Sequence, residues 1–263
     1  MTDSPSGDRP ENLTSEEVKN ALGYPDYRRL WINNLIYMFV ANAQRFAIGW
    51  LVLDGLGGNE TRQGMAVFML GIPVAFIVMQ AGVLADRVDR RALLIRSQSG
   101  LLLVVLATLV LLGLDQLTYS WVLILSVLSG VAQAFGHPVR QALIPLLVPK
   151  HMLMNAVALN ALAMTGSMIL SAPLVKIAGD LFAFEGVYGL QLVMLIVGLF
   201  ALRRLQTPPV TAGPKRRLIQ EAASALRHVM NDLRLRVLFL LLAVASISVN
   251  AAVMVTMQAK VKE

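Results

Sequence analysis

Long apolar segments alternate with shorter polar connections along most of the chain. A transmembrane helix needs about 20 mostly apolar residues to cross a hydrocarbon core of about 30 Å. Seven segments reach or approach that length, and they cover residues 30–53, 64–85, 92–114, 117–137, 157–178, 187–202 and 237–257. The sixth segment is short, but the apolar run at 181–184 can extend it toward the N-terminus. The pattern predicts an all-α integral membrane protein.

The overall composition agrees with this prediction. The 263 residues are 56% hydrophobic and 15% charged, whereas an average soluble domain is about 45–50% apolar and about 25% charged. The lipid bilayer is therefore the first expected partner of the chain. The sequence contains no cysteine, which excludes a disulfide framework, a thiolate nucleophile and a Cys-ligated zinc site.

The distribution of basic residues predicts the orientation. The net charge is +7, but the basic residues lie between apolar segments and form no nucleic-acid recognition motif, so no nucleic-acid partner is expected. Cytoplasmic connections carry the excess of Lys and Arg. The N-terminal tail and the second, fourth and sixth connections hold nearly all of these residues, while the opposite connections hold only Arg62 and Lys176. We therefore expect a multi-pass protein of the plasma membrane, here a bacterial inner membrane, with a cytoplasmic N-terminus.

These observations divide the chain into four parts. Residues 1–29 form a polar cytoplasmic tail that lacks the features of a signal peptide, and residues 30–203 form a six-helix transmembrane unit. Residues 204–236 form a cytoplasmic linker in which apolar residues recur at a helical period between basic ones. Such an amphipathic helix suits either the membrane surface or a soluble partner. Residues 237–263 contain the seventh helix.

The sequence lacks recognisable catalytic chemistry. It has no His-Glu-x-x-His zinc motif, no phosphate-binding loop and no Gly-x-Ser-x-Gly nucleophile turn. The three histidines, His137, His151 and His228, have no ligand spacing. We therefore expect neither an enzyme nor a metal site, no cofactor, and no nucleotide-driven mechanism.

The first apolar segment contains an unusual number of polar residues. Arg45 lies well inside it, and a charge at the centre of a membrane helix costs at least about 2.5–3.5 kcal/mol. Two explanations stay open: Arg45 lines a central cavity and meets an anionic or polar substrate, or it extends to the nearby extracellular interface. The candidate cavity residues are Asn34, Asn42, Arg45, Gln80 and Gln133. The glutamines, with Gln98, are weaker candidates because single amides often bond between helices.

A charged motif follows the second segment. Residues 82–91 read Gly-Val-Leu-Ala-Asp-Arg-Val-Asp-Arg-Arg, and they resemble the major facilitator superfamily motif Gly-x-Leu-Ala-Asp-Arg-x-Gly-Arg-Lys/Arg between helices 2 and 3. Its residues here are Gly82, Asp86, Arg87, Arg90 and Arg91. The resemblance implies a latch on the cytoplasmic side in which Asp86 pairs with Arg90. Asp89 departs from the family pattern, which has glycine there. An ordinary basic loop is the alternative.

A second stretch, residues 130–160, resembles the exporter branch called transmembrane secretion effectors, which includes siderophore and drug exporters. The residues that carry this resemblance include Pro138, Arg140, Gln141 and Pro145. In the fifth segment the chain has Ala172-Pro173 where the branch often has Gly-Pro, a pair associated with antiport. Proton coupling therefore stays open.

The resemblance implies a specific architecture and activity. The superfamily has twelve helices in two six-helix halves, and each half consists of two three-helix inverted repeats. We expect this chain to be a fragment that stops at helix 7, at the start of a truncated C-terminal half, so the missing C-terminal half is an expected partner. The implied function is export of a small molecule, such as a drug or siderophore, by a secondary transporter that works by alternating access. The alternative is a non-transporting assembly or regulatory module that retains only the half-fold.

Overall fold

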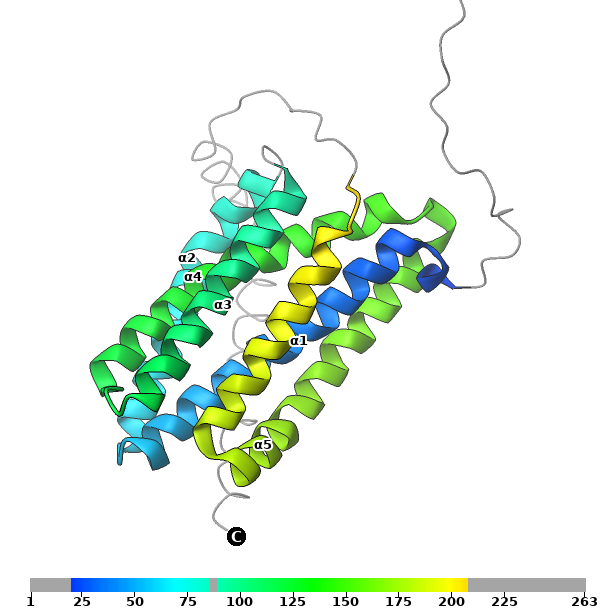
Figure 1. Ribbon diagram of the computed structural model, residues 1–263. Coiled ribbons are helices and arrows are strands. Elements are labelled where there is room, and N and C mark those ends of the chain that lie inside the picture. The colour runs from blue at the N-terminus through cyan, green and yellow to red at the C-terminus, as the bar shows by residue number, and fades with distance from the viewer. Residues whose placement is uncertain (1–19, 86–88, 208–263) are drawn as a thin grey trace, which may run out of the picture. The chain divides into compact units, whose positions relative to one another are not determined.

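The computed structural model describes residues 20–85 and 89–207, without the side chains of 75, 76 and 78–85. Within these residues the chain is helical and contains no strand (Figure 1). The long helices are α1 (Pro25–Trp50), α2 (Glu60–Ala85), α3 (Arg90–Gly113), α4 (Tyr119–Leu147) and α5 (Leu153–Arg203). Short helices η1 (Ala21–Gly23), η2 (Leu51–Gly55) and η3 (Lys150–Met152) flank them. The predicted all-α class is confirmed.

Helix α5 consists of two helical segments that fold back on each other (Figure 1). The break lies at Phe182 (φ −138°) and Ala183 (φ 53°), and the second value is in the left-handed region. That conformation costs a residue with a Cβ roughly 1–2 kcal/mol, so the two-residue turn is held by the packing of its flanks. We call residues 153–181 the first segment of α5 and residues 184–203 its second segment. The run at 181–184 was expected to extend the sixth segment, but it contains the break, and only its last residue belongs to the second segment.

Four stretches of the described residues are long and apolar enough to cross a membrane: Pro25–Gly55, Arg90–Gly113, Tyr119–Leu147 and Lys150–Arg203, the last of which includes both segments of α5. Helix α2 has 26 residues, which at about 1.5 Å per residue gives roughly 39 Å. The six predicted segments between residues 30 and 202 coincide with helical structure except at residues 114, 117 and 118. The predicted seventh segment and nearly all of the predicted linker lie outside the described residues.

Helix α4 continues to Leu147, beyond the predicted boundary at His137. Pro138 removes one backbone hydrogen bond, but the residues after it pack firmly: Val139, Leu143 and Ile144 are buried in an apolar cluster with Leu94 and Leu202. The packing of this face of α4 outweighs the lost hydrogen bond. Neighbouring helices compensate for a proline in this way within a membrane bundle. The placement of Arg140 in a connection was therefore wrong, because Arg140 lies inside α4.

Helix α1 packs along α5, and α2 packs along α4. The first segment of α5 presents to α1 a buried row of small residues: Ala156, Asn160, Ala163, Ser167, Ser171 and Gly179. Small residues allow close approach of two helices, which favours association in lipid. A Cβ on Gly179 would collide with the ring of Trp50 on α1. At the other pair, a Cβ on Gly130 of α4 would collide with the carbonyl of Leu70 on α2.

Hydrogen bonds fix the register between α1 and α5. The Tyr27 hydroxyl donates to the Ala156 carbonyl at 2.7 Å. The Trp31 indole NH donates to the Leu159 carbonyl at 2.9 Å. These aromatic donors lie four residues apart on α1, so they join one face of α1 to the first turns of α5.

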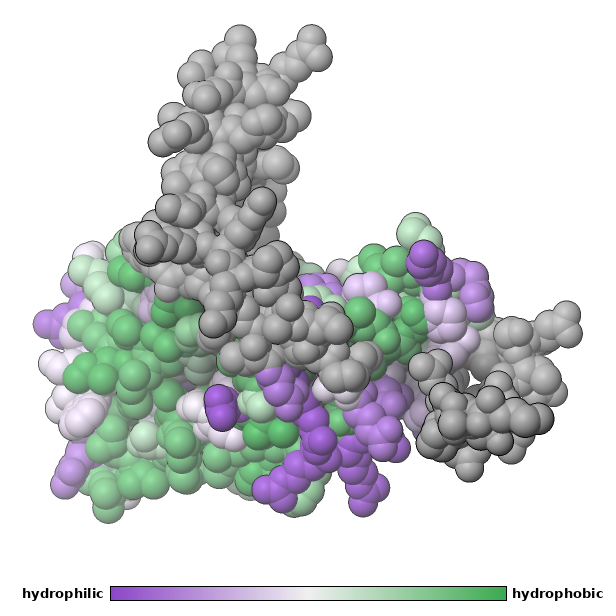
Figure 2. Space-filling view, turned by 90° about the horizontal axis from the view of Figure 1, so that it is seen from above, coloured by the Kyte–Doolittle hydropathy of each residue, from purple (hydrophilic) through white to green (hydrophobic). Residues whose placement is uncertain are grey.

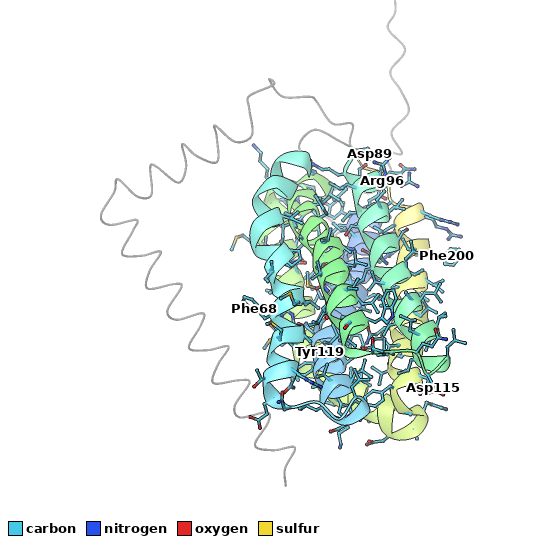
Figure 3. All side chains as sticks on the ribbon, turned by 90° about the vertical axis from the view of Figure 1, so that its left-hand side faces the viewer. Phe68, Asp89, Arg96, Asp115, Tyr119 and Phe200 are labelled. Atoms are coloured by element: carbon cyan, nitrogen blue, oxygen red, sulfur yellow. The ribbon has the colours of Figure 1, made fainter. Side chains whose placement is uncertain are left out.

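The side surfaces of the helices are apolar, and charged residues gather near the helix ends. Figure 2 shows broad apolar areas beside smaller hydrophilic groups. In Figure 3, Asp89 and Arg96 lie near one end of the helices and Asp115 near the other, with Phe68 and Phe200 between them. Phe68 is 62% exposed and Phe200 is 61% exposed. This arrangement suits helices that are surrounded by lipid.

Candidate functional site

A buried arginine lies at the centre of a polar network inside the bundle. Arg140 on α4 is only 1% exposed. Its Nη2 donates to Asn33 Oδ1 at 3.2 Å and to Gln98 Oε1 at 3.0 Å. Its Nη1 donates to the Gly136 carbonyl at 3.0 Å. One side chain of α4 is thereby linked to α1 and α3.

The same amides continue the network to the second segment of α5. Asn33 Nδ2 donates to Gln98 Oε1 and to the Gly198 carbonyl, both at 2.9 Å. Gln98 Nε2 donates to the Leu195 carbonyl at 3.0 Å. Gly198 is required for this approach, because a Cβ there would lie 2.5 Å from Gln98 Nε2 and 3.0 Å from Asn33 Nδ2. Four helical elements therefore meet at one polar cluster, which we call the Arg140 network: Asn33, Tyr37, Gln98, Gly136, Arg140 and Gly198.

Neutral groups stabilise the Arg140 charge. The guanidinium carbon lies 3.6 Å from the centre of the Tyr37 ring, and Arg140 forms no ion pair with any described carboxylate. Hydrogen bonds to a charged group contribute about 1.5–3 kcal/mol each, and a desolvated cation–π contact contributes about 2 kcal/mol. Three such bonds and one ring contact can offset a burial penalty of several kcal/mol. The network can therefore hold a charge in the bundle without a counterion.

A second polar chain joins α1, α5 and α4. Asn34 Nδ2 donates a short hydrogen bond to Asn160 Oδ1, and Asn160 Nδ2 donates to Gln141 Oε1 at 3.4 Å. Asn34 is buried, whereas Gln141 is exposed. The structure thus connects one predicted cavity residue, Asn34, with one residue of the predicted exporter motif, Gln141. Asn160, which connects them, was not among the predicted site residues.

Two other cavity candidates lie together on α1. Arg45 is exposed, and Asn42, three residues earlier, is half-buried. Neither side chain forms a hydrogen bond or an ion pair with a described residue. Arg45 lies 20 residues after Pro25 and 10 residues before Gly55, the two ends of this span. If a core of about 30 Å is centred on the span, the Arg45 Cα lies about 7 Å inside it.

The remaining candidates lie on other helices, α2 and α4. Gln133 is buried on α4. Its backbone carbonyl accepts a hydrogen bond of 3.4 Å from the Tyr37 hydroxyl, and its side-chain Nε2 has no partner among the described residues. Pro138 is half-buried and Pro145 is exposed, and both lie within α4. The side chain of Gln80 lies outside the described residues.

The charged motif after α2 is only partly described. Asp86 and Arg87 lie outside the described residues, as do the surroundings of Gly82. Asp89 is the N-cap of α3, and its Oδ1 accepts from the Arg91 backbone NH at 2.9 Å. The Arg91 side chain donates to the Arg203 carbonyl at the end of α5. The aspartate that departs from the family pattern thus begins a helix.

The long apolar helices and the polar clusters buried between them are typical of a multi-pass membrane protein. The sequence model of the Major Facilitator Superfamily matches residues 30–261. Most of the chain is covered by this match, so the protein belongs to the major facilitator superfamily, whose members are secondary transporters and generally not enzymes. A comparison with curated proteins found no match.

Proposed function

We propose that the protein is a small-molecule exporter of the secretion-effector type, such as a drug or siderophore exporter, which works by alternating access. The exporter motif supports this proposal, since Arg140 and Gln141 both take part in bonds between helices. The family membership does not favour the non-transporting alternative. In our proposal the six helices of residues 30–203 act as one half, and a second half that begins within 237–263 completes the transport path.

The exposure of Arg45 within the first span is the main support for the proposed transport site. A guanidinium at the centre of a membrane helix costs at least about 2.5–3.5 kcal/mol, and part of that cost applies to one that faces hydrocarbon about 7 Å inside the core. Facing a water-filled cavity removes most of that cost, and Asn42 on the same side of α1 gives the cavity a second polar group. We therefore place Arg45 and Asn42 at the cavity wall, where an arginine selects an anionic or polar substrate.

Cysteine labelling tests this placement, because the chain has no native cysteine. In the complete transporter, Asn42→Cys keeps Arg45 and adds one thiol, and Leu103→Cys serves as the control because Leu103 is 62% exposed on the apolar side of α3. A water-soluble maleimide reacts with thiolate, which forms in water and not in lipid. We expect labelling at position 42 to be at least about tenfold faster than at 103. Equal slow labelling would refute the cavity and favour extension of Arg45 to the interface.

Transport measurements give a second test. Arg45→Gln is expected to lower efflux strongly while expression stays normal. Arg62→Gln is the matched control, since Arg62 is also exposed but lies in the first turn of α2. Unchanged efflux in Arg45→Gln, or an equal loss in both variants, would contradict the assignment.

The cytoplasmic N-terminus and the plasma membrane location belong to the same proposal. A reporter inserted after Arg91 is expected in the cytoplasm, and one inserted after Gly58 outside, because the basic connections stay on the cytoplasmic side. A reporter after Arg91 that lies outside would contradict the orientation.

A further inference from the structure

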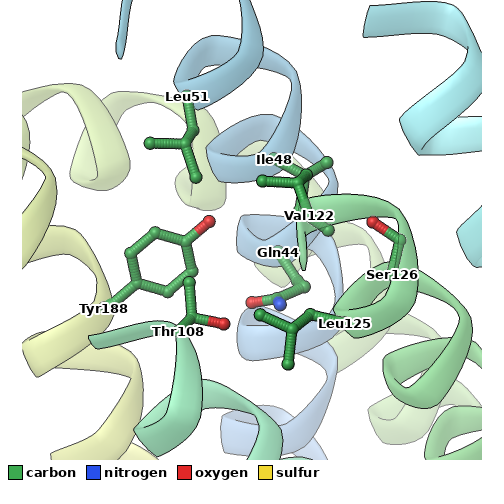
Figure 4. A pocket seen from close by; sticks show the side chains of 8 residues that line it. All are labelled: Gln44, Ile48, Leu51, Thr108, Val122, Leu125, Ser126 and Tyr188. Atoms are coloured by element: carbon green, nitrogen blue, oxygen red, sulfur yellow. The ribbon is translucent and has the colours of Figure 1, made fainter. Parts of the chain in front are cut away.

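A small cavity lies between α1, α3, α4 and the second segment of α5 (Figure 4). The centre of a water-sized sphere can occupy about 10 Å³ of it. Its lining consists of Gln44, Ile48, Leu51, Thr108, Val122, Leu125, Ser126 and Tyr188. Four of these side chains are aliphatic and four carry oxygen, so the cavity brings several polar groups together inside an apolar bundle.

Three of the oxygen atoms have no hydrogen-bond partner among the described residues: Gln44 Oε1, Ser126 Oγ and Tyr188 OH. Gln44 is 1% exposed, and Ser126 and Tyr188 are fully buried. Leaving such a buried atom without a partner costs about 1–3 kcal/mol. The three atoms come from α1, α4 and the second segment of α5, and all three side chains line this one cavity.

The neighbouring polar groups are already bonded, which fixes the directions of the side chains. Gln44 Nε2 donates to Ser129 Oγ at 3.3 Å, which leaves Gln44 Oε1 as the free acceptor of the amide. Thr108 Oγ1 donates to the Val104 carbonyl at 2.9 Å within α3. The free groups are therefore one acceptor and two hydroxyls, each of which can donate or accept.

We propose that this cavity binds one structural water molecule, which joins Gln44, Ser126 and Tyr188. About 10–15 Å³ is the smallest volume that holds a water, and a buried water needs two to four polar partners. The water donates to Gln44 Oε1 and to one hydroxyl, and it accepts from the other. One molecule thus satisfies all three atoms and links three helical elements.

The chemistry of the lining favours water over a cation. The lining residues include no carboxylate, and burying an uncompensated ion costs far more than burying a neutral molecule. An apolar ligand does not fit either, because the volume holds only one water-sized molecule and the three oxygens would stay without partners.

Hydroxyl-radical labelling with an X-ray pulse in ¹⁸O water tests the site in the full chain in detergent. Bound water generates the radical in place, so Tyr188 is expected to be oxidised at least about fivefold more than Tyr27. Tyr27 is the matched control because it is also buried, at 1% exposure, while its hydroxyl donates to a protein carbonyl. Equal low oxidation of the two tyrosines would overturn the proposal.

A variant of Ser126 and a change of the buffer cation complete the test. Ser126→Thr adds one methyl group beside a cavity of only about 10 Å³, so we expect it to displace the water and oxidation of Tyr188 to fall to the level of Tyr27. The unfolding temperature is expected to fall too, because Gln44 and Tyr188 lose their partner. Unchanged oxidation of Tyr188 in Ser126→Thr would overturn the proposal. A drop in Tyr188 oxidation when sodium replaces choline in the buffer would also overturn it, because that result would indicate a cation site.

Discussion

The Arg140 network predicts strong energetic coupling between Asn33 and Arg140. Asn33→Leu removes one of the three acceptors of a buried guanidinium, and the Gly198 carbonyl loses its donor as well. At about 1.5–3 kcal/mol for the charged bond and about 1 kcal/mol for each of the two neutral bonds that Asn33 donates, the expected loss is roughly 3.5–5 kcal/mol. Arg140→Met removes the charge together with its desolvation cost and leaves Asn33 Oδ1 without its donor, for an expected loss of about 1–3 kcal/mol.

The double variant separates the network from general packing. With Leu at 33 and Met at 140, the protein has no buried guanidinium that needs the Asn33 acceptor. The double variant is therefore expected to lose about 1.5–3 kcal/mol less free energy of unfolding than the sum of the single variants. The free energy of unfolding can be followed in a detergent titration by the fluorescence of the three tryptophans. Asn42→Leu replaces Asn33→Leu in the control cycle, since Asn42 has no hydrogen bond to a described residue.

The control cycle should be additive within about 0.5 kcal/mol. Additivity in the Asn33–Arg140 cycle as well would refute the reasoning. It would mean that the guanidinium finds other partners and that the hydrogen bonds of the network contribute little to stability.

Three further predictions concern glycine packing and the charged motif. Gly198→Ala should destabilise the protein by about 1–3 kcal/mol through overpacking. Gly189→Ala on the same segment is the control: no atom lies within 4 Å of the new Cβ, so this variant should be neutral or slightly stabilising. Unfolding curves of both variants check this. Asp89→Ala should cost about 0.5–2 kcal/mol through loss of the helix cap, while Asp89→Asn should be mild, and equal stability of the two variants would contradict the cap. If Asp86 belongs to a latch, Asp86→Asn should sharply lower transport by the complete transporter at normal expression, and equal transport would favour a simple basic loop.

Much of the fold could be predicted from the sequence because lipid imposes a simple rule. Each span is long and apolar, so hydropathy alone located the six helices between residues 30 and 202. The apolar run at 181–184 did not mark the start of the second segment of α5, because the break at Phe182 and Ala183 falls inside it. Helix ends were harder to predict, since apolarity stops at His137 while α4 continues through Pro138 to Leu147.

The polar network could not be predicted from local patterns. Asn33 and Gln98 are 65 residues apart, and Arg140 is 107 residues from Asn33. Nothing in the spacing shows that these three side chains meet, and an arginine shortly after a proline is typical of a cytoplasmic connection. Gln98, a weaker cavity candidate, does bond between helices, as single amides often do. The predicted pairing of Asp86 with Arg90 stays a prediction.

The distribution of partners along the chain also affects how the protein is made. Asn34 on α1 bonds to Asn160, which is 126 residues later in the chain. At a synthesis rate of about 5–20 residues per second, the ribosome needs roughly 6–25 s to add those residues. During that time α1 carries Asn33, Asn34 and Gln44 into the membrane without their final partners. The most polar of the described helices is thus synthesised before the helices that satisfy it, and its amides gain their final partners only after α3, α4 and α5 have been made.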